Sequence, residues 1–154
     1  MLDTDNGFSY SYPAVPDAVA SARNSLTDFA VAVGAKGERL EAIRLAASEA
    51  VTNAVLHAYK GSGGAIQLSA SYVHGEFWLL IADDGSGLRP RGPHSGLGLG
   101  LALIAQLADE FQILSRSTGG TELRMQFRLA EQDRPGDSER GQLRGSVSSA
   151  AVPA

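Results

Sequence analysis

The chain has 154 residues, of which 44% are hydrophobic, and these values suit one globular domain with a sizeable core. Its formal net charge is −4 and its 13 Lys and Arg residues form no block, which disfavours nucleic acid as a partner. The absence of cysteine excludes disulfides and thiolate metal sites. The start MLDTDNGFSY lacks the features of a signal peptide, and the longest apolar run, Phe77–Ala82, is too short to cross a bilayer. We therefore expect a cytoplasmic protein without a membrane partner.

The first third of the chain predicts one strand and two helices. Aromatic residues alternate with serines over Phe8–Tyr12, a strand pattern that Pro13 interrupts. Apolar residues then recur at helical spacing over Asp17–Val33, and Gly34 ends the run. A longer, alanine-rich helix is predicted over Glu38–Tyr59, before the loop KGSGG.

The remainder predicts four strands and one more helix. Ile66–Tyr72 alternates as a strand, His74-Gly75 forms a tight turn, and Phe77–Ala82 is apolar on both faces. Leu97–Glu110 has the pattern of a helix. The last two strands and the turn between them are predicted at Phe111–Ser115, Thr121–Leu129 and Thr118–Gly120.

The resulting order βααββαββ predicts an α+β fold. Adjacent strand pairs, with helices enough for only one face, indicate a two-layer α/β sandwich whose mixed, mainly antiparallel sheet is covered by three helices. We place this domain at residues 8–130. Residues 131–154 carry almost no large apolar side chain, so we expect a disordered tail.

A polar stripe interrupts the second helix in the stretch SEAVTNAVLHAY. Glu49, Asn53 and His57 are each four residues apart, and a step of four advances an α-helix by only about 40°, so they share one face. A solvated helix face is one interpretation. Such faces usually carry Lys, Arg and Glu pairs rather than an amide and an imidazole among small apolar residues. The second interpretation of the stripe is therefore a functional site.

Two glycine clusters follow this helix. One is DDGSG at Asp83–Gly87, and the other is SGLGLGLALI at Ser95–Ile104, where a helix begins. Backbone N–H groups at a helix N-terminus favour phosphate. A Rossmann site is excluded because a broken loop, not a strand, precedes the second cluster. A P-loop is excluded because neither Lys36 nor Lys60 stands in a GK[ST] motif.

The ordered motifs E-x-x-x-N, D-x-G-x-G and G-x-G-x-G-L resemble the N, G1 and G2 boxes of the GHKL ATPases, a superfamily that includes gyrase-type ATPases and sensor histidine kinases. SEAVTNAVLHAY together with TGGTELRMQF is similar to the narrower family of bacterial anti-sigma-factor serine/threonine kinases. The resemblance covers roughly Phe8–Leu129. It implies the Bergerat-type ATP-binding fold.

The resemblance implies roles for individual residues. Asn53 matches the ligand of Mg²⁺, Glu49 matches the general base, and Asp83 matches the carboxylate that binds the adenine amino group. His57 matches a position near the phosphates, although capping or packing the helix end is an equal alternative. Further contacts to ATP are implied for Gly85, Gly87, Thr121 and the run Ser95, Gly96, Leu97, Gly98, Leu99 and Gly100. Asp84 is expected to be a solvated turn residue.

The resemblance also implies partners, namely a sigma factor and an anti-anti-sigma protein, and it allows a homodimer. Arg23 and Phe29 match a spacing found in related anti-sigma proteins, where the arginine lies on a partner-binding surface; a solvated arginine is the alternative. The lid departs from the family, because only Leu88–Ser95 separates the two glycine boxes and His94 stands where an arginine is usual. Arg89 or Arg91 could replace that arginine. We therefore expect a kinase, with an ATP-dependent binding module of little activity as the alternative.

Overall fold

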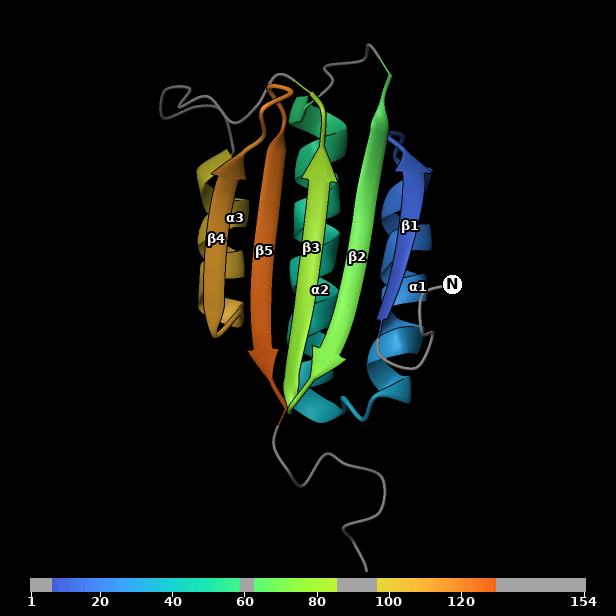
Figure 1. Ribbon diagram of the computed structural model, residues 1–154, viewed down its shortest axis with the longest axis vertical. Coiled ribbons are helices and arrows are strands. Elements are labelled where there is room, and N and C mark those ends of the chain that lie inside the picture. Colours follow the sequence, from blue (N-terminus) through green and yellow to red (C-terminus); the bar gives the residue numbers. More distant parts are fainter. Residues whose placement is uncertain (1–6, 59–62, 86–96, 130–154) are drawn as a thin grey trace, which may run out of the picture.

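The computed structural model describes residues 7–58, 63–85 and 97–129, which form a layer of helices against one face of a sheet (Figure 1). Helix α2 continues into a π-helical segment, Ala54–Ala58. The other elements, in chain order, are β1 Gly7–Pro13, α1 Asp17–Ala32, α2 Gly37–Asn53, β2 Ala65–Val73, β3 Glu76–Asp83, α3 Leu97–Leu107, β4 Glu110–Ser115 and β5 Thr121–Arg128. This is the predicted α+β order.

The sheet has the strand order β1-β2-β3-β5-β4, and all four pairings among its described strands are antiparallel. The prediction of a mixed sheet was therefore wrong in its parallel part. Strands β3 and β4 do run in the same direction, with α3 as the crossover between them, but β5 lies between the two strands (Figure 1). The final hairpin thus inserts its second strand between these two parallel strands, and they do not pair with each other.

Two predicted chain reversals are confirmed, and each depends on a positive φ angle. His74 (φ 51°) and Gly75 (φ 82°) form a two-residue hairpin turn between β2 and β3, as turns of type I′ require. Gly34 (φ 103°) follows the end of α1. There the N–H of Ala35 donates to the carbonyl of Ala30 at 2.9 Å, a Schellman closure that satisfies a terminal helix carbonyl.

Two helix ends differ from the prediction. The α-helical part of α2 stops at Asn53, before the π-helical segment, and Tyr59 lies outside the described residues. Helix α3 ends at Leu107 instead of Glu110, because the N–H of Asp109 donates to the carbonyl of Gln126 at 2.8 Å and joins the chain to the sheet. Arg39 of α2 pairs with the carboxylate of Asp109 at 3.0 Å and ties the helix layer to this junction.

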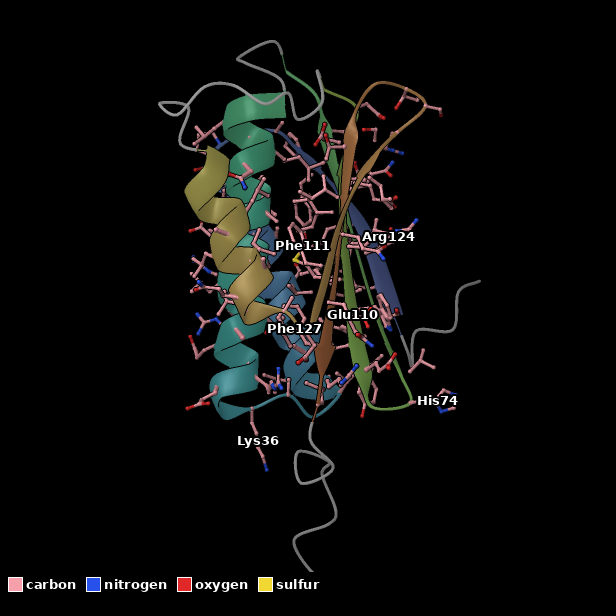
Figure 2. The ribbon with its side chains drawn as sticks, turned by 90° about the vertical axis from the view of Figure 1, so that its left-hand side faces the viewer. Lys36, His74, Glu110, Phe111, Arg124 and Phe127 are labelled. Atoms are coloured by element: carbon pink, nitrogen blue, oxygen red, sulfur yellow. The ribbon has the colours of Figure 1, made fainter. Side chains whose placement is uncertain are left out.

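The core lies between the two layers. Alternate residues of each strand point toward the helices, and Figure 2 shows Phe111 and Phe127 in this space. Burial of each large apolar side chain contributes about 1.5–3 kcal/mol, so this shared core holds the helices against the sheet. The largest fully buried side chains are Phe77, Phe127, Leu26, Ile43, Ile66, Leu68, Leu79, Ile81, Ile104, Met125 and Val51.

The opposite face of the sheet is not covered by a helix of the described ranges, and Arg124 extends from it in Figure 2. Trp78 and Leu80 of β3, with Arg124 of β5 and two serines of β2, line a shallow hollow of about 340 Å³ on this face. The indole N–H of Trp78 donates to the carboxylate of Glu76 at 3.2 Å. We call this surface the open face.

Candidate functional site

Those predicted site residues that the structure describes lie at one end of the molecule, where four segments converge. The C-terminal end of α2, the start of α3, the end of β3 and the turn between β4 and β5 all lie at the upper end in Figure 1. This arrangement follows from the topology, because α2 and β3 end at the same edge at which α3 begins. The sandwich thereby brings the three sequence motifs to one place.

Glu49 and Asn53 face α3 at its first glycine turn. A methyl group placed on Gly100 would lie 3.0 Å from Oε2 of Glu49 and 3.3 and 3.4 Å from Nδ2 and Oδ1 of Asn53. The carboxylate and the amide are therefore neighbours, and both contact the surface that glycine leaves bare. The helical spacing of Glu49 and Asn53 predicted this proximity, and α3 contributes its backbone to the same site.

The amide of Asn53 has the chemistry of an incomplete binding site. Its Nδ2 is buried and has no hydrogen-bond partner among the described residues. A buried donor without a partner costs about 1–3 kcal/mol, so its retention indicates a ligand that accepts a hydrogen bond. A phosphate oxygen is such an acceptor, and the amide oxygen beside it is a ligand of the type that Mg²⁺ prefers. These groups fit the predicted Mg²⁺ and phosphates.

The π-helical segment that follows Asn53 contains His57. Wide turns of this kind occur frequently at functional sites. The side chain of His57 lies outside the described part of the structure, so its predicted role near the phosphates stays a prediction.

Asp83 is a buried carboxylate at the end of β3. The residue is only 8% exposed, and Oδ1 accepts a hydrogen bond from the N–H of Gly85 at 2.9 Å. Burial raises the pKa of Asp83 above its ordinary value, although backbone hydrogen bonds from Gly85 and Thr121 and the charge of Arg116 oppose that shift, while the charge of Asp84 adds to it. A buried carboxylate with fixed backbone donors suits recognition of an amine.

Thr121 and Gly120 complete this part of the site from β5 and the preceding turn. Thr121 is buried and opposes Ser115 in the β4–β5 pairing. Gly120 packs so closely on the backbone of Asp83 that an added methyl group would overlap the Asp83 carbonyl and lie 2.7 Å from the Cα of Asp84. Only glycine leaves room for this contact.

Asp84 is not the simple solvated turn residue that was expected. Its side chain is 54% exposed, but Oδ1 accepts a hydrogen bond from Thr118 at 2.7 Å and pairs with Arg116 at 3.0 Å. The prediction missed Arg116 and Thr118, because Arg116 lies just before the TGGT stretch and Thr118 begins it, and this segment looks like an ordinary turn. The two consecutive acids in DDGSG were the available signal for a basic partner.

Part of the predicted site lies outside the described residues. This applies to Gly87, Ser95, Gly96, the lid arginines Arg89 and Arg91, and the side chains of Leu97 and Leu99. Gly98 and Gly100 lie within the first turn of α3. The phosphate contacts predicted for the run Ser95–Gly100 all stay predictions. The structure shows only that Gly100 lies beside Glu49 and Asn53.

Comparison with known proteins agrees with this geometry. Residues 12–127 match the family described as the histidine kinase-like ATPase domain. The chain belongs to this ATPase family. The resemblance predicted from the three sequence boxes is thus confirmed, together with the fold that it implied.

Named relatives of this ATPase domain are bacterial serine-protein kinases and anti-sigma F factors. The serine-protein kinase RsbW of Bacillus licheniformis is 32% identical over 66% of this chain and 73% of its own length. The protein of the same name from Oceanobacillus iheyensis is 31% identical over 79% of this chain and 85% of its own. The anti-sigma F factor of Clostridium acetobutylicum is 25% identical over 82% of this chain and 96% of its own.

A solved structure of a protein with an RsbW domain is also similar to this chain. The structure of the RsbU and RsbW domains of a Mycobacterium tuberculosis protein is 26% identical, with a TM-score of 0.64 over 80% of this chain. The present chain spans only 32% of that longer protein. Among the helices of the described ranges, none has the length and apolar character needed to cross a membrane.

Proposed function

We propose that this protein binds ATP with Mg²⁺ and phosphorylates a serine or threonine of an anti-anti-sigma protein, and that it also binds a sigma factor. The observation that carries the proposal is the contact of Glu49 and Asn53 with Gly100, beside the buried amide nitrogen of Asn53 that has no partner in the described chain. The named kinases and anti-sigma factors among the relatives support the choice of protein substrate and partner.

The roles proposed for the residues follow from their chemistry. Glu49 would accept the proton of the attacking hydroxyl while the hydroxyl oxygen bonds to the γ-phosphorus and ADP leaves. Asn53 would hold Mg²⁺ through Oδ1, and the bound ion supplies charge neutralisation on the phosphates. Asp83 would accept hydrogen bonds from the adenine amino group, with its carboxylate directed by the N–H of Gly85.

The partner-binding role proposed for α1 rests on Arg23. Its Nε is buried and has no hydrogen-bond partner in the part of the chain that the structure describes. Phe29, the other residue of the predicted motif, packs edge-to-face on Phe8 at 5.1 Å and lies 5.7 Å from Phe77. Phe29 therefore anchors α1 on the sheet, and Arg23 is the residue of this pair that is suited to contact a sigma factor. The homodimer stays a prediction.

An ATP-dependent binding module is the second candidate. The observation that favours it is the short segment Leu88–Ser95 between the glycine boxes, which offers little chain to enclose the phosphates. In this alternative, nucleotide changes the affinity for a protein partner, and Glu49 has no catalytic task.

The test is single-turnover phosphoryl transfer to a co-purified partner. Glu49→Ala should lower the transfer rate by about 10²–10⁴-fold, the usual contribution of a positioned base, with ATP affinity unchanged within about threefold. Glu41→Ala, on an exposed position of the same helix, is the matched control and should leave transfer unchanged. Undiminished transfer in Glu49→Ala would refute its catalytic role. Background transfer by the native protein, with a partner complex that differs between ATP and ADP, would establish the binding module.

A further inference from the structure

The turn between β4 and β5 lies against the acidic end of β3. Inside the turn, the N–H of Arg116 donates to the carbonyl of Gly120, and the N–H of Gly119 donates to the carbonyl of Arg116, both at 2.9 Å. Gly120 packs directly on the backbone of Asp83. The turn is thus closed by its own hydrogen bonds and packs against Asp83, the residue proposed to recognise adenine.

Arg116 contacts the end of β3 at two oxygens. Its NH1 donates to the backbone carbonyl of Asp83 at 3.3 Å and pairs with Oδ1 of Asp84 at 3.0 Å. The hydroxyl of Thr118 donates to the same oxygen of Asp84 at 2.7 Å. Two side chains from one turn therefore hold Asp84 at the same carboxylate oxygen.

Asp84 stands between Asp83 and Gly85, whose N–H donates to the Asp83 carboxylate at 2.9 Å. The backbone conformation of Asp84 therefore decides whether Gly85 reaches that carboxylate. We propose that Arg116, assisted by Thr118, is a positioning residue of the nucleotide site, which holds Asp84 so that the Asp83 carboxylate keeps the direction needed for adenine. This inference rests on the proposed binding of ATP.

The charges around Asp83 give the inference a distinctive signature. The charged groups that influence the Asp83 carboxylate are Asp84, which raises its pKa, and Arg116, which lowers it. Removal of the Arg116 charge should therefore raise the pKa of Asp83, whereas removal of the Asp84 charge should lower it. These opposite shifts would show that both charges act on the Asp83 carboxylate, and the ATP affinities then test whether Arg116 and Asp84 position it.

The first experiment follows the Asp83 carboxyl carbon by NMR during a pH titration of the nucleotide-free protein, with Asp83→Asn used to assign the signal. Arg116→Met should move the midpoint up, Asp84→Asn should move it down, and Arg116→Lys should return it toward the native value. Arg124→Met is the matched control, because Arg124 pairs with Glu122 at 3.1 Å on the open face. This control should leave the midpoint unchanged.

The second experiment measures ATP affinity by calorimetry at neutral pH. Arg116→Met and Asp84→Asn should each weaken binding by about two- to fivefold, the range for a partly exposed ion pair, and Arg124→Met should not. Thr118→Val removes only one hydrogen bond and should also weaken ATP binding. This variant keeps the test decisive if Arg116→Met does not fold.

The outcomes separate this inference from the proposed function. Unchanged Asp83 midpoints and unchanged ATP affinities in the Arg116, Asp84 and Thr118 variants would overturn the positioning role. A native protein that binds no ATP would overturn the proposed function instead, while the NMR titration would still measure the effect of Arg116 on Asp83.

Discussion

A single carboxylate, Asp83, combines poor solvation with selective hydrogen bonding. It is buried at the end of a strand, and burial raises its pKa even though two backbone N–H groups favour the ionised form. An ionised group whose pKa is raised on folding destabilises the folded state. The residue proposed to recognise adenine is therefore one that the fold retains at a cost in stability.

Asp83→Asn should weaken ATP binding by about 1–3 kcal/mol, because a charge-assisted hydrogen bond becomes a neutral one. The affinity for GTP should fall less, since guanine carries a carbonyl where adenine carries the amine. An asparagine amide can donate a hydrogen bond to that carbonyl. Direct titration of the native and variant proteins with both nucleotides measures this change. Equal affinities of the native protein for ATP and GTP would contradict the role of Asp83.

The same substitution should raise the thermal stability at neutral pH. As pH rises from the ordinary pKa of an aspartate through the raised pKa of Asp83, the unfolded chain loses its proton first, so the native protein loses stability across that window. The variant has no such ionisation at residue 83. Thermal melts over a pH series should therefore show the variant gaining on the native protein as pH rises, whereas parallel curves would contradict the burial penalty.

Gly100 shows the effect of one missing methyl group. Alanine favours a helix interior over glycine by about 0.5–1 kcal/mol, so Gly100→Ala should leave the free energy of unfolding unchanged or raise it. Its methyl group would nevertheless press on Glu49 and Asn53, with the nearest atom, Oε2 of Glu49, at 3.0 Å. We expect at least a roughly tenfold loss in phosphoryl transfer, in line with the sensitivity of catalysis to misplaced groups.

The control for Gly100→Ala is Gln106→Ala, at an exposed position of α3, which should change neither transfer nor nucleotide affinity. Native transfer rates in Gly100→Ala would show that the space beside Glu49 is not used in the reaction.

At the scale of elements, most helices, strands and turns could be predicted from the periodicity of apolar residues in the sequence. The alternation in β2 and the turn at His74-Gly75 are local properties, and both appear where the sequence predicts them. Pairing partners are not local, which is why the insertion of β5 between β3 and β4 was not foreseen. The π-helical segment also depends on the surrounding fold, because the sequence AVLHA is compatible with a continued α-helix.

The site divides in the same way. Glu49 and Asn53 share a helix face by spacing alone, so their proximity could be predicted from the sequence. The contacts of Arg116 and Thr118 with Asp84 join distant parts of the chain and arise only when β5 pairs with β3. A residue whose role depends on a long-range pairing leaves no periodic signal in one sequence.

In the β4–β5 turn, a methyl group added at Gly120 should destabilise the protein more than one added at the neighbouring Gly119. Gly120→Ala would force a methyl group into the backbone of Asp83 and Asp84, and should lower the free energy of unfolding by about 1–3 kcal/mol or more. Gly119→Ala meets no atom within 4 Å and suffers only from its positive φ of 96°, which costs about 1–2 kcal/mol.

Chemical denaturation of the two variants separates these costs. ATP affinity should fall in Gly120→Ala and remain near native in Gly119→Ala. Equal effects on both quantities would show that backbone conformation, and not the contact with Asp83, limits this position.

At the scale of the whole molecule, the sheet separates two environments. The helices and the proposed nucleotide site share one side and one end, whereas the other side carries the hollow around Trp78, Leu80 and Arg124. The strands connect these regions directly, since β3 carries Trp78 on the open face and ends at Asp83. One strand therefore contributes to both surfaces.

Trp78 is the single tryptophan of the chain, so the intrinsic fluorescence excited at the red edge of its absorption comes from the open face alone. Saturation with ATP should leave the emission maximum in place, because the indole points away from the helix layer. Any molecule that covers the open face should shift the emission to shorter wavelength. The emission is recorded during a titration with ATP and, separately, during a titration with a partner protein that lacks tryptophan, and it reports which side of the sheet is occupied. A shift of the emission maximum with ATP alone would show that the nucleotide site and the open face are mechanically coupled through β3.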